Sequence, residues 1–292
     1  MKKNILVILF ITGCAFIDND IIDEENKFNG TDETLDIVSW NIENFPKIDS
    51  TIELLAPIID SLNIDIFALQ EITSSSSLNE LVNQLSEGWE AIIGPSHYGQ
   101  RNAYLINTET INYLDNYEIL NDAPNEPFTK FPLVLEFTFS DINFIIINNH
   151  FKCCGNGSID YGNYNDEEYR RLYAMELIKN YIDENHNADN VIILGDLNDE
   201  LIDNENVFDM IINDFENYLF TDIGIASGSP YYWSYPTDPS HIDHILITNE
   251  LFNYEDTTAT LFIDQWYFDG FNDYNTFISD HRPIAIRLNI NP

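Results

Sequence analysis

Basic side chains, cysteines and long hydrophobic runs are all scarce in this sequence. Its 292 residues include 12 Lys and Arg against 50 Asp and Glu, which gives a formal net charge of −38. So acidic a chain repels polyanions such as nucleic acid unless cations or a local basic patch intervene. Three cysteines are too few for a disulfide framework. The one long hydrophobic run, at residues 5–11, is too short to cross a bilayer.

The sequence has enough hydrophobic residues to form a folded core. Hydrophobic residues make up 44% and aromatic residues 13% of the chain, which excludes a wholly disordered, collagenous or low-complexity protein. Dense patterning runs from Leu35 to Ile290 without an internal repeat or a second linker. We therefore expect a single folded domain over residues 34–292.

The N-terminus is typical of a bacterial export signal. Two lysines precede the apolar run, which ends in Ile11-Thr12-Gly13-Cys14. This ending resembles a lipobox, in which residues 1–13 are removed and Cys14 becomes the lipidated N-terminus. The alternatives are an ordinary signal peptide that happens to contain a cysteine, or a first core strand. We expect an exported lipoprotein anchored in an outer membrane, periplasmic or on the cell surface, with residues 14–33 as a flexible acidic tether.

Apolar runs of the strand type alternate with helical patterns along the domain. Strands are predicted at residues 35–40, 64–69, 133–139, 144–147, 191–194, 242–248 and 284–288. Helices are predicted after the first strand, with Ser50 and Glu53 spaced as a capping box, and over residues 165–182. Fully apolar strands fit sheets that are covered on both faces, so we expect a layered α/β fold.

Polar groups suited to a divalent cation or a phosphate recur at the ends of these strands. They are Trp40-Asn41-Ile42-Glu43-Asn44, Gln70-Glu71, Asn149-His150, Gly195-Asp196-Leu197-Asn198, His241-Ile242-Asp243-His244 and Ser279-Asp280-His281-Arg282-Pro283. Each alone has an ordinary explanation, such as a solvated turn, an Asx turn or a structural histidine. Six such groups are harder to dismiss, because strand ends at one edge of a sheet converge and the loops there carry function.

Taken together, the groups resemble the endonuclease/exonuclease/phosphatase superfamily of metal-dependent phosphoesterases, which includes the pancreatic-type deoxyribonucleases. The matching blocks follow the family order: residues 36–42, 65–71, 149–152, 191–198, 233–235 leading into 241–243, and 279–283. Each block is short, but jointly they are specific. The resemblance implies a four-layer α/β sandwich, in which two packed mixed sheets are flanked by helices and the site lies at one rim.

The resemblance also implies a role for each polar residue. The metal ligands would be Asn41, Glu71 and Asp280, whose hard oxygen atoms suit Mg²⁺ or Mn²⁺, with Ca²⁺ as a further candidate. The catalytic residues would be His150, Asp196, Asn198, Asp243 and His281. In that scheme His281 is the general base, held in its tautomer by Asp243, and His150 donates a hydrogen bond or a proton to the phosphoryl oxygens. Asp196 and Asn198 orient or activate the attacking water.

Few basic residues are placed to bind the phosphate of a substrate. Lys152 lies two residues after His150 and Arg282 directly follows His281, and both support a local anion site. Lys130 resembles a family position often held by a phosphate-contacting arginine, and it could equally be a surface lysine at the start of a strand. Arg170 and Arg171 extend the inward stripe of the long helix, so we expect buried ion-pair partners there rather than substrate contacts.

Two features depart from the family pattern. In the deoxyribonuclease branch an acid near residue 100 supports the first histidine, whereas this sequence has Gln100-Arg101 there. Cys153-Cys154 directly follows Lys152 and does not form a Cys-x-x-Cys zinc pattern. The pair could be a strained vicinal disulfide in an oxidising compartment, or two free thiols.

We therefore expect an exported, lipid-anchored, Mg²⁺-dependent phosphodiester hydrolase that acts on DNA or RNA as an endonuclease. The alternative enzyme is a phosphatase or phosphodiesterase for a small phosphoester or a phospholipid headgroup, which the acidic charge favours. A catalytically inactive surface-binding module is the third hypothesis, and the complete set of motif residues argues against it. The sequence indicates no protein partner.

Overall fold

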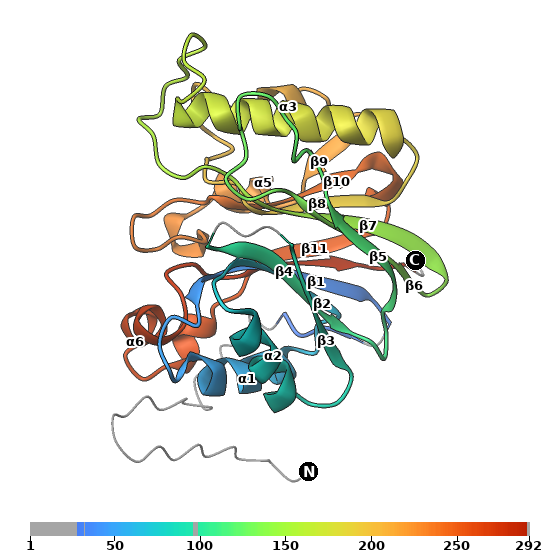
Figure 1. Ribbon diagram of the computed structural model, residues 1–292, viewed down its shortest axis with the longest axis vertical. Helices are drawn as coiled ribbons and strands as arrows, with labels where there is room; N and C mark the ends of the chain where they lie inside the picture. The colour runs from blue at the N-terminus through green and yellow to red at the C-terminus, as the bar shows by residue number, and fades with distance from the viewer. Residues whose placement is uncertain (1–27, 32, 96–98, 291–292) are drawn as a thin grey trace.

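Two mixed β-sheets form the centre of the molecule, with helices on their outer faces (Figure 1). The structure is a computed structural model that describes residues 28–31, 33–95 and 99–290. The predicted signal peptide and Cys14 lie outside the described residues. The arrangement is the four-layer α/β sandwich expected from the sequence. No helix within the described ranges is long and apolar enough to span a membrane.

The first sheet has the strand order β11-β12-β1-β2-β4-β3. In this order the strands span Glu255–Thr260, Ile284–Leu288, Leu35–Phe45, Ile66–Ile72, Arg101–Asn107 and Trp89–Ile93. β1 and β2 are parallel, and the other neighbours are antiparallel. Helices α1 (Thr51–Leu62), α2 (Ser75–Gln84) and α6 (Phe271–Phe277) lie on the outer side of this sheet (Figure 1).

The second sheet has the strand order β5-β6-β7-β8-β10-β9. In this order the strands span Asn112–Glu118, Leu133–Phe139, Ile142–His150, Val191–Asp196, Asp243–Thr248 and Tyr218–Phe220. β7 and β8 are parallel at its centre. Helix α3 (Glu167–Asn185) runs along the outer face (Figure 1). The connections contain α4 (Asp209–Ile212), α5 (Ile223–Ala226) and the 3₁₀ turns η2 (Pro230–Tyr232), η3 (Asn249–Leu251) and η4 (Ile263–Trp266).

Apolar side chains fill all three spaces between the four layers. β1 shows how one strand serves two of them, because successive side chains of a strand point to opposite faces. Leu35 and Ile37 pack between the sheets, whereas Val38 and Trp40 pack against the helices. A strand buried on both faces needs a nearly continuous apolar run, which is the pattern that the sequence shows.

Two local features differ from the expectations drawn from the sequence. Helix α1 does begin after Ser50, but this residue has a helical φ of −86° and ψ of −4°, and its side chain makes no capping hydrogen bond. A capping serine normally takes an extended conformation, so the predicted capping box does not form. Residues 28–31 pack on the domain: Phe28 is buried beneath Arg287, and Gly30 N donates to Leu62 O (2.8 Å). The packed domain therefore includes residues assigned to the tether.

Candidate active site

The second sheet places three polar residues side by side at one rim. His150 at the end of β7 and Asp243 at the start of β10 are both register partners of Asp196, the last residue of β8. Leu194 and Ile245, two positions further into their strands, pack between the sheets. Because side chains alternate along a strand, Asp196 and Asp243 face the first sheet as those residues do. The apolar layer between the sheets thus ends in a buried row of His150, Asp196 and Asp243, called the polar row below.

The first sheet contributes Asn41 from β1 and Glu71 from β2. Asn41 lies on the inward-facing side of β1, and its Nδ2 donates to Asp196 Oδ2 (2.9 Å). By simple alternation Glu71 would face the helices, as Leu69 does. A break in the β1–β2 register and a φ of 66° at Glu71 turn its carboxylate instead toward Asn41, with Oε1 at 3.5 Å from Nδ2. Irregular strand geometry of this kind commonly redirects a side chain near a functional site.

The loop before β12 brings Asp280 and His281 to the same place. Ser279 ties this loop to β1, because its Oγ donates to Asn41 O (2.6 Å) and accepts from His281 N (2.9 Å). His281 Nδ1 lies 2.7 Å from Asp243 Oδ2. His281 Nε2 lies 3.9 Å from Asp280 Oδ1. Asp243 therefore engages one ring nitrogen, as predicted, while the other faces the carboxylates.

The carboxylates around His281 control its protonation. Burial alone would lower the pKa of His281, but attraction to Asp243, Asp196 and Asp280 outweighs burial and raises the pKa to about 10. Burial likewise acts to raise the pKa of Asp243, and the pairing with His281 holds that pKa below its ordinary value. His281 and Asp243 are thus an imidazolium–carboxylate pair at neutral pH. His281 Nε2 lies 3.9 Å from Asp196 Oδ2.

His150 is in the opposite electrostatic setting. Burial, with repulsion from Lys130 and His281, lowers its pKa to about 3, so the ring is neutral at neutral pH. Its Nε2 lies 3.5 Å from Asp196 Oδ2 and 3.9 Å from Glu71 Oε1. Its Nδ1 is buried and has no hydrogen-bond partner within the described part of the chain. A neutral imidazole donates through one nitrogen only, and here Nε2 is the nitrogen that faces the site.

The acid that supports this histidine in the deoxyribonuclease branch has no counterpart at residues 100–101. Gln100 Nε2 donates to Asn44 Oδ1 (2.8 Å), and Arg101 Nη2 donates to Ser75 Oγ (2.6 Å). Both side chains are therefore engaged away from His150. Neither side chain supplies a partner for the buried Nδ1 of His150.

The surplus of carboxylates fits a divalent cation. Burial, and then the neighbouring carboxylates, raise the pKa of Asp196 to about 7 and that of Asp280 to about 6. Such buried acids are neutralised either by protons or by a cation. One ligand atom from each of Asp196, Asp243 and His281 can be chosen so that all three lie within 4.8 Å of one another. Asn41 contacts both Asp196 and Glu71, so the residues present offer the hard oxygen atoms that Mg²⁺ or Mn²⁺ prefers.

Asn198 stands beside the polar row on the turn that follows β8. Its φ of 55° is in the left-handed region, which asparagine tolerates better than most residues. Its backbone N donates to Asp196 Oδ1 (3.1 Å), and its Nδ2 donates to Phe151 O (3.3 Å). The turn thus joins the ends of β7 and β8 next to the catalytic candidates.

The two predicted phosphate ligands, Lys130 and Lys152, have different surroundings. Burial lowers the pKa of Lys130, and the charges of Glu71 and Asp196 act in the opposite direction. Lys152 Nζ donates to Cys153 O (3.0 Å) and lies 4.0 Å from Glu167 Oε1. Its charge is therefore directed along its own loop.

The two adjacent cysteines in that loop are thiols. Cys153 and Cys154 are exposed and free, and their Sγ atoms lie 2.9 Å apart. Of the two forms left open by the sequence, the structure has the free pair.

Two of the arginines are held in structural ion pairs. Arg171 is buried and bonds through Nε to Asp199 Oδ2 (2.7 Å), as expected for the inward stripe of α3. Arg282 contradicts the expectation of a local anion site. Its Nε and Nη2 bind Asp264 at 3.0 and 2.7 Å, and its Nη1 donates to Tyr231 O (2.8 Å). A guanidinium engaged in this two-point pairing has little capacity left for a phosphate.

Two neighbours of the site lie within the sequence motifs but were given no role there. Glu43 Oε2 accepts the backbone N–H of Asp280 (3.0 Å) and also pairs with Lys47. The ring of Tyr235 lies 4.8 Å from that of His281, centroid to centroid. Glu43 did lie within a strand-end motif, two residues after Asn41, so a signal for it was present. Tyr235 is the last residue of the matching block at residues 233–235, so a signal for it was present as well.

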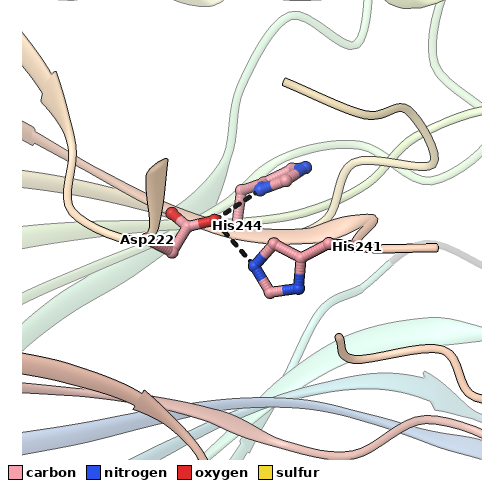
Figure 2. A group of neighbouring side chains, drawn as sticks. All are labelled: Asp222, His241 and His244. Carbon is pink, nitrogen blue, oxygen red and sulfur yellow. Dashed lines mark hydrogen bonds and ion pairs between the residues drawn. The ribbon is translucent and has the colours of Figure 1, made fainter. Parts of the chain in front are cut away.

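A second buried group of metal-type side chains lies beside the start of β10. Asp222 Oδ2 is 3.0 Å from His241 Nε2 and 2.6 Å from His244 Nδ1 (Figure 2). The outer nitrogens are also engaged: His241 Nδ1 accepts from Ser234 N (3.2 Å), and His244 Nε2 donates to Asp199 O (2.8 Å). All four ring nitrogens therefore have protein partners, and none is left to bind a metal ion.

The partners of His244 require protons on both ring nitrogens. Nε2 faces a carbonyl oxygen and Nδ1 faces a carboxylate, and neither of these groups can donate a hydrogen bond. Burial would lower the pKa of His244, but the Asp222 carboxylate raises it above its ordinary value. Burial acts to raise the pKa of Asp222, and the two histidines lower it far more. The group is a buried ion pair that secures the strand on which Asp243 lies.

The family model described as Endonuclease/Exonuclease/phosphatase family matches residues 38–281. This range contains the polar row together with Asn41, Glu71 and His281. No curated protein matches the chain.

Several solved structures have the same fold at low sequence identity. The TDP2 structure from D. rerio in complex with a single-strand DNA product is 16% identical, with a TM-score of 0.66 over 88% of this chain and 99% of that one. An endonuclease/exonuclease/phosphatase family protein from Bacteroides thetaiotaomicron is 17% identical, with a TM-score of 0.62 over 87% and 97%. The human Nocturnin catalytic domain with a bound sulfate anion is 14% identical, with a TM-score of 0.64 over 90% and 97%.

Proposed function

The chain belongs to the endonuclease/exonuclease/phosphatase family, and we propose that it is a metal-dependent phosphodiester hydrolase whose substrate is nucleic acid. One observation carries the proposal. The polar row faces Asn41 and Glu71 across the two sheets, and His281 spans from Asp243 to Asp196. Phosphoryl transfer needs this combination of a proton acceptor, a proton or hydrogen-bond donor and a site for positive charge, all around one small space.

Asn41, Glu71 and Asp280 are the proposed ligands for Mg²⁺ or Mn²⁺. When bound there, such an ion would supply positive charge to the phosphoryl oxygens in the transition state. The raised pKa of Asp280 supports this assignment, because burial and Glu43 disfavour its charged form unless a cation is present.

His281 is the proposed general base. Asp243 holds Nδ1–H, so Nε2 is the nitrogen that takes a proton from the attacking water. Asp196 and Asp280 help to raise the pKa of His281 to about 10, and the base must be unprotonated to act. The assignment therefore requires that the charge on these two carboxylates be neutralised, which is the effect of a cation at the site.

His150, Asp196 and Asn198 are proposed to position the reacting groups. His150 acts as a neutral hydrogen-bond donor through Nε2 to a phosphoryl oxygen, because its pKa of about 3 keeps the ring unprotonated. Asp196 has a pKa of about 7 and so can accept a hydrogen bond or a proton from water near neutral pH. Asn198, fixed on the same turn, completes the contacts to the phosphate.

Two related structures and one lysine support an extended anionic substrate. The D. rerio TDP2 structure holds a single-strand DNA product, and the Nocturnin domain holds a sulfate anion. Lys130 is a half-buried cation that interacts electrostatically with Glu71 and Asp196. One observation favours the second candidate, a small phosphoester or a phospholipid headgroup. The chain carries a net charge of −38, and Arg171 and Arg282 are already paired with carboxylates.

The deciding experiment compares substrates and metal conditions. The full chain is assayed on supercoiled plasmid, a single-stranded oligonucleotide and a panel of small phosphoesters, with Mg²⁺, Mn²⁺ or EDTA. His281→Ala is the inactive variant, and His186→Ala at the far end of α3 is the matched control. Cleavage of nucleic acid that needs the metal and His281 supports the proposal. Turnover of small esters alone moves the protein to the second candidate, and no metal-dependent turnover of any substrate contradicts both.

Export and anchoring are proposed on the sequence alone. Residues 1–13 would be removed and Cys14 lipidated, which would place the enzyme at an outer membrane. Metabolic labelling with a fatty acid tests this, with Cys14→Ser as the variant and Cys153→Ser as the matched control. Label on the parent and the control, and none on Cys14→Ser, is the expected result. An unlabelled parent, or an equally labelled Cys14→Ser, contradicts the proposal.

A further inference from the structure

Two exposed thiols lie side by side on the loop that continues from His150. Cys153 and Cys154 are both exposed and free, and their Sγ atoms lie 2.9 Å apart. Along the chain, Phe151 and Lys152 separate the pair from His150. Neither cysteine belongs to the predicted catalytic or metal-binding set, so the proposed function leaves the pair without a role.

Two residues of α3 hold the loop in the shape that brings the thiols together. Arg171 Nη1 donates both to Lys152 O (2.8 Å) and to Cys154 O (2.7 Å), which fixes the backbone on either side of the pair. Glu168 Oε1 accepts from Asn156 N (2.6 Å), two residues further on. Arg171 and Glu168 are both buried. The thiols are therefore presented to solvent on a loop that is anchored to the helix.

Cys154 has a backbone conformation that few residues with a side chain adopt. Its φ is 72°, in the left-handed region. Such conformations persist where the surrounding structure enforces them, and they concentrate at functional sites. Here the enforcing contact is the hydrogen bond from Arg171 to the carbonyl of Cys154. The contact of the two sulfur atoms is thus a product of the fold as well as of adjacency in the sequence.

The two sulfur atoms have unequal surroundings. Cys154 Sγ donates to Cys153 Sγ, and Lys152 Nζ lies 3.8 Å from Cys153 Sγ. The hydrogen bond to Cys153 raises the pKa of Cys154. Lys152 Nζ also lies 4.0 Å from Glu167 Oε1, so its charge is shared between the two groups. Cys154 therefore keeps its proton, while Cys153 faces a thiol donor and an ammonium group, which are the surroundings of a nucleophilic sulfur.

The surroundings of the pair do not suit a metal ion. A structural zinc site needs four ligands, and among the described residues neither cysteine belongs to a group of three or more metal-type side chains. The ammonium group of Lys152 next to Cys153 also repels a cation. The chemistry that fits the pair is therefore a reaction at the sulfur atoms.

We propose that Cys153 and Cys154 form a thiol–disulfide exchange site, which a small-molecule disulfide oxidises to a bond between the two cysteines. The Cys153 thiolate attacks one sulfur of R–S–S–R, forms a mixed disulfide and releases RS⁻. Cys154 then gives up its proton and attacks Cys153 Sγ, which already lies within 2.9 Å, and a second RS⁻ leaves. The chain loses two electrons and two protons, and R–S–S–R becomes two RSH.

The bond between the two cysteines should be easily reduced again. Adjacent Cα atoms lie about 3.8 Å apart, closer than in most disulfides, so the ring that forms is strained. Strained and exposed disulfides are the labile ones, whereas structural disulfides resist reduction. The pair is thus suited to a reversible change on the loop next to the candidate active site. The inference goes beyond the proposed function and does not depend on it.

The test follows the thiols by mass spectrometry and needs no enzymatic turnover. The full chain is treated with oxidised glutathione, quenched in acid, alkylated and digested. Trypsin cuts on both sides of residues 153–170, so one peptide carries both cysteines and excludes Cys14. Cys154→Ser and Cys153→Ser separate the two steps, and circular dichroism confirms that each variant is folded. The parent unfolded in urea is the control with the same sequence but without the anchored loop.

We expect the folded parent to form the internal disulfide without retaining glutathione, and dithiothreitol to restore both thiols. Cys154→Ser should retain one glutathione because its second step is blocked, and Cys153→Ser should react more slowly. The unfolded parent should accumulate mixed disulfides. Thiols that stay reduced in the folded parent, or an internal disulfide that forms equally fast in urea, would overturn the proposal.

A further pair of variants tests the charge next to Cys153. Lys152→Gln removes this charge, and Lys179→Gln removes the same charge from a lysine that pairs with Asp183 and Asp214. Both are measured in the Cys154→Ser chain as the rate of glutathione attachment. We expect Lys152→Gln to slow the attachment about two- to fivefold, the effect of one charge at about 4 Å in water, partly offset by higher intrinsic nucleophilicity. Lys179→Gln should react at the parental rate. Equal rates in all three chains would overturn the assignment of Cys153 as the attacking sulfur.

Discussion

Asp196 and Asp243 are register partners on adjacent antiparallel strands, so two buried carboxylates stand side by side in one sheet. Two acids so close cannot both be ionised without compensation. The positive charge of His281 compensates the two carboxylates unequally. Its Nδ1 bonds to Asp243, while its Nε2 lies 3.9 Å from Asp196. The pKa of Asp243 is lowered, and burial raises that of Asp196 to about 7. The pair thus separates into a permanent anion and an acid that titrates near neutral pH, a division typical of acid–base sites.

Removing either member of the His281–Asp243 pair should abolish most of the activity. His281→Ala deletes the proposed base, and Asp243→Asn removes the charge that holds and orients it. We expect each variant to lose about 10²- to 10⁴-fold in kcat, the usual contribution of a positioned general base. The measurement is initial-rate kinetics with Mg²⁺ on whichever phosphodiester the parent turns over fastest. His186→Ala should keep parental rates, and an active His281→Ala would exclude the ring as the base.

Mg²⁺ should stabilise the fold through Glu71. Ions that bind only the folded chain raise its unfolding free energy by about 2.7 kcal/mol at 100 times the dissociation constant. We expect a rise in melting temperature for the parent on adding MgCl₂, measured against EDTA, and little or none for Glu71→Gln. Glu176→Gln on the exposed side of α3 removes the same charge away from the site and should respond as the parent does. A full Mg²⁺ response in Glu71→Gln would remove this residue from the ligand set.

The sequence predicts most of the site because the site extends the alternation of its strands. Asn41 and Asp196 continue the faces of Ile37 and Leu194, which pack between the sheets, so their meeting follows from strand periodicity and a two-sheet fold. Periodicity fails for Glu71, whose φ of 66° reverses its side. A backbone irregularity of this kind leaves no mark in a hydrophobic pattern.

The arginine side chains show a second limit of prediction from the sequence. Arg282 follows His281 and was expected to serve an anion, yet its partner is Asp264, on η4 in the connection between β11 and β12. Of the two arginines predicted on the inward stripe of α3, Arg171 is buried in an ion pair as expected. Arg170 is only half-buried, and its Nη2 donates to the backbone carbonyl of Glu126, so the expectation was wrong for it. Where the partner comes from a distant and irregular segment, only the folded structure shows whether a charge is free.

The buried ion pair of Asp222 and His244 should be a major contributor to stability. Asp222→Asn leaves an imidazolium buried without its counter-charge, so we expect a loss of about 3–5 kcal/mol in unfolding free energy by urea denaturation. The matched control is Asp189→Asn, which breaks the pair with His186 at 2.9 Å. Because the Asp189 side chain is 54% exposed, that change should lower stability by no more than about 1 kcal/mol. Similar losses in the two variants would contradict a buried charged pair.

The same pair should show its effect within a defined pH window. The pKa of Asp222 is lowered on folding. Its contribution to the unfolding free energy is therefore present above the pKa of the unfolded chain, about 3.9, and is lost as the pH falls. The pKa of His244 is raised on folding. Its contribution to the unfolding free energy is therefore complete below about pH 6.5 and is lost as the pH rises through the pKa of the folded protein. The stability difference between the parent and Asp222→Asn should therefore be greatest between about pH 4 and 6.5. A difference that does not vary with pH would indicate that the loss comes from packing.

Gly195 should be irreplaceable, because it allows β7 and β8 to approach each other beside the polar row. Its φ is 136°, and a Cβ atom there would lie 2.0 Å from Asn149 O, its partner strand's backbone. Gly195→Ala must separate the strands or change this backbone angle, so we expect a loss of more than about 1 kcal/mol in unfolding free energy. Gly224→Ala in α5, where the new methyl group meets nothing within 4 Å, should be neutral or mildly stabilising. Because Asp196 is the next residue, Gly195→Ala should also lower Mg²⁺-dependent turnover at temperatures where the variant remains folded. Parental stability in Gly195→Ala would contradict this prediction, because it would mean that β7 and β8 can move apart without cost. The approach of His150 to Asp196 would then not depend on Gly195.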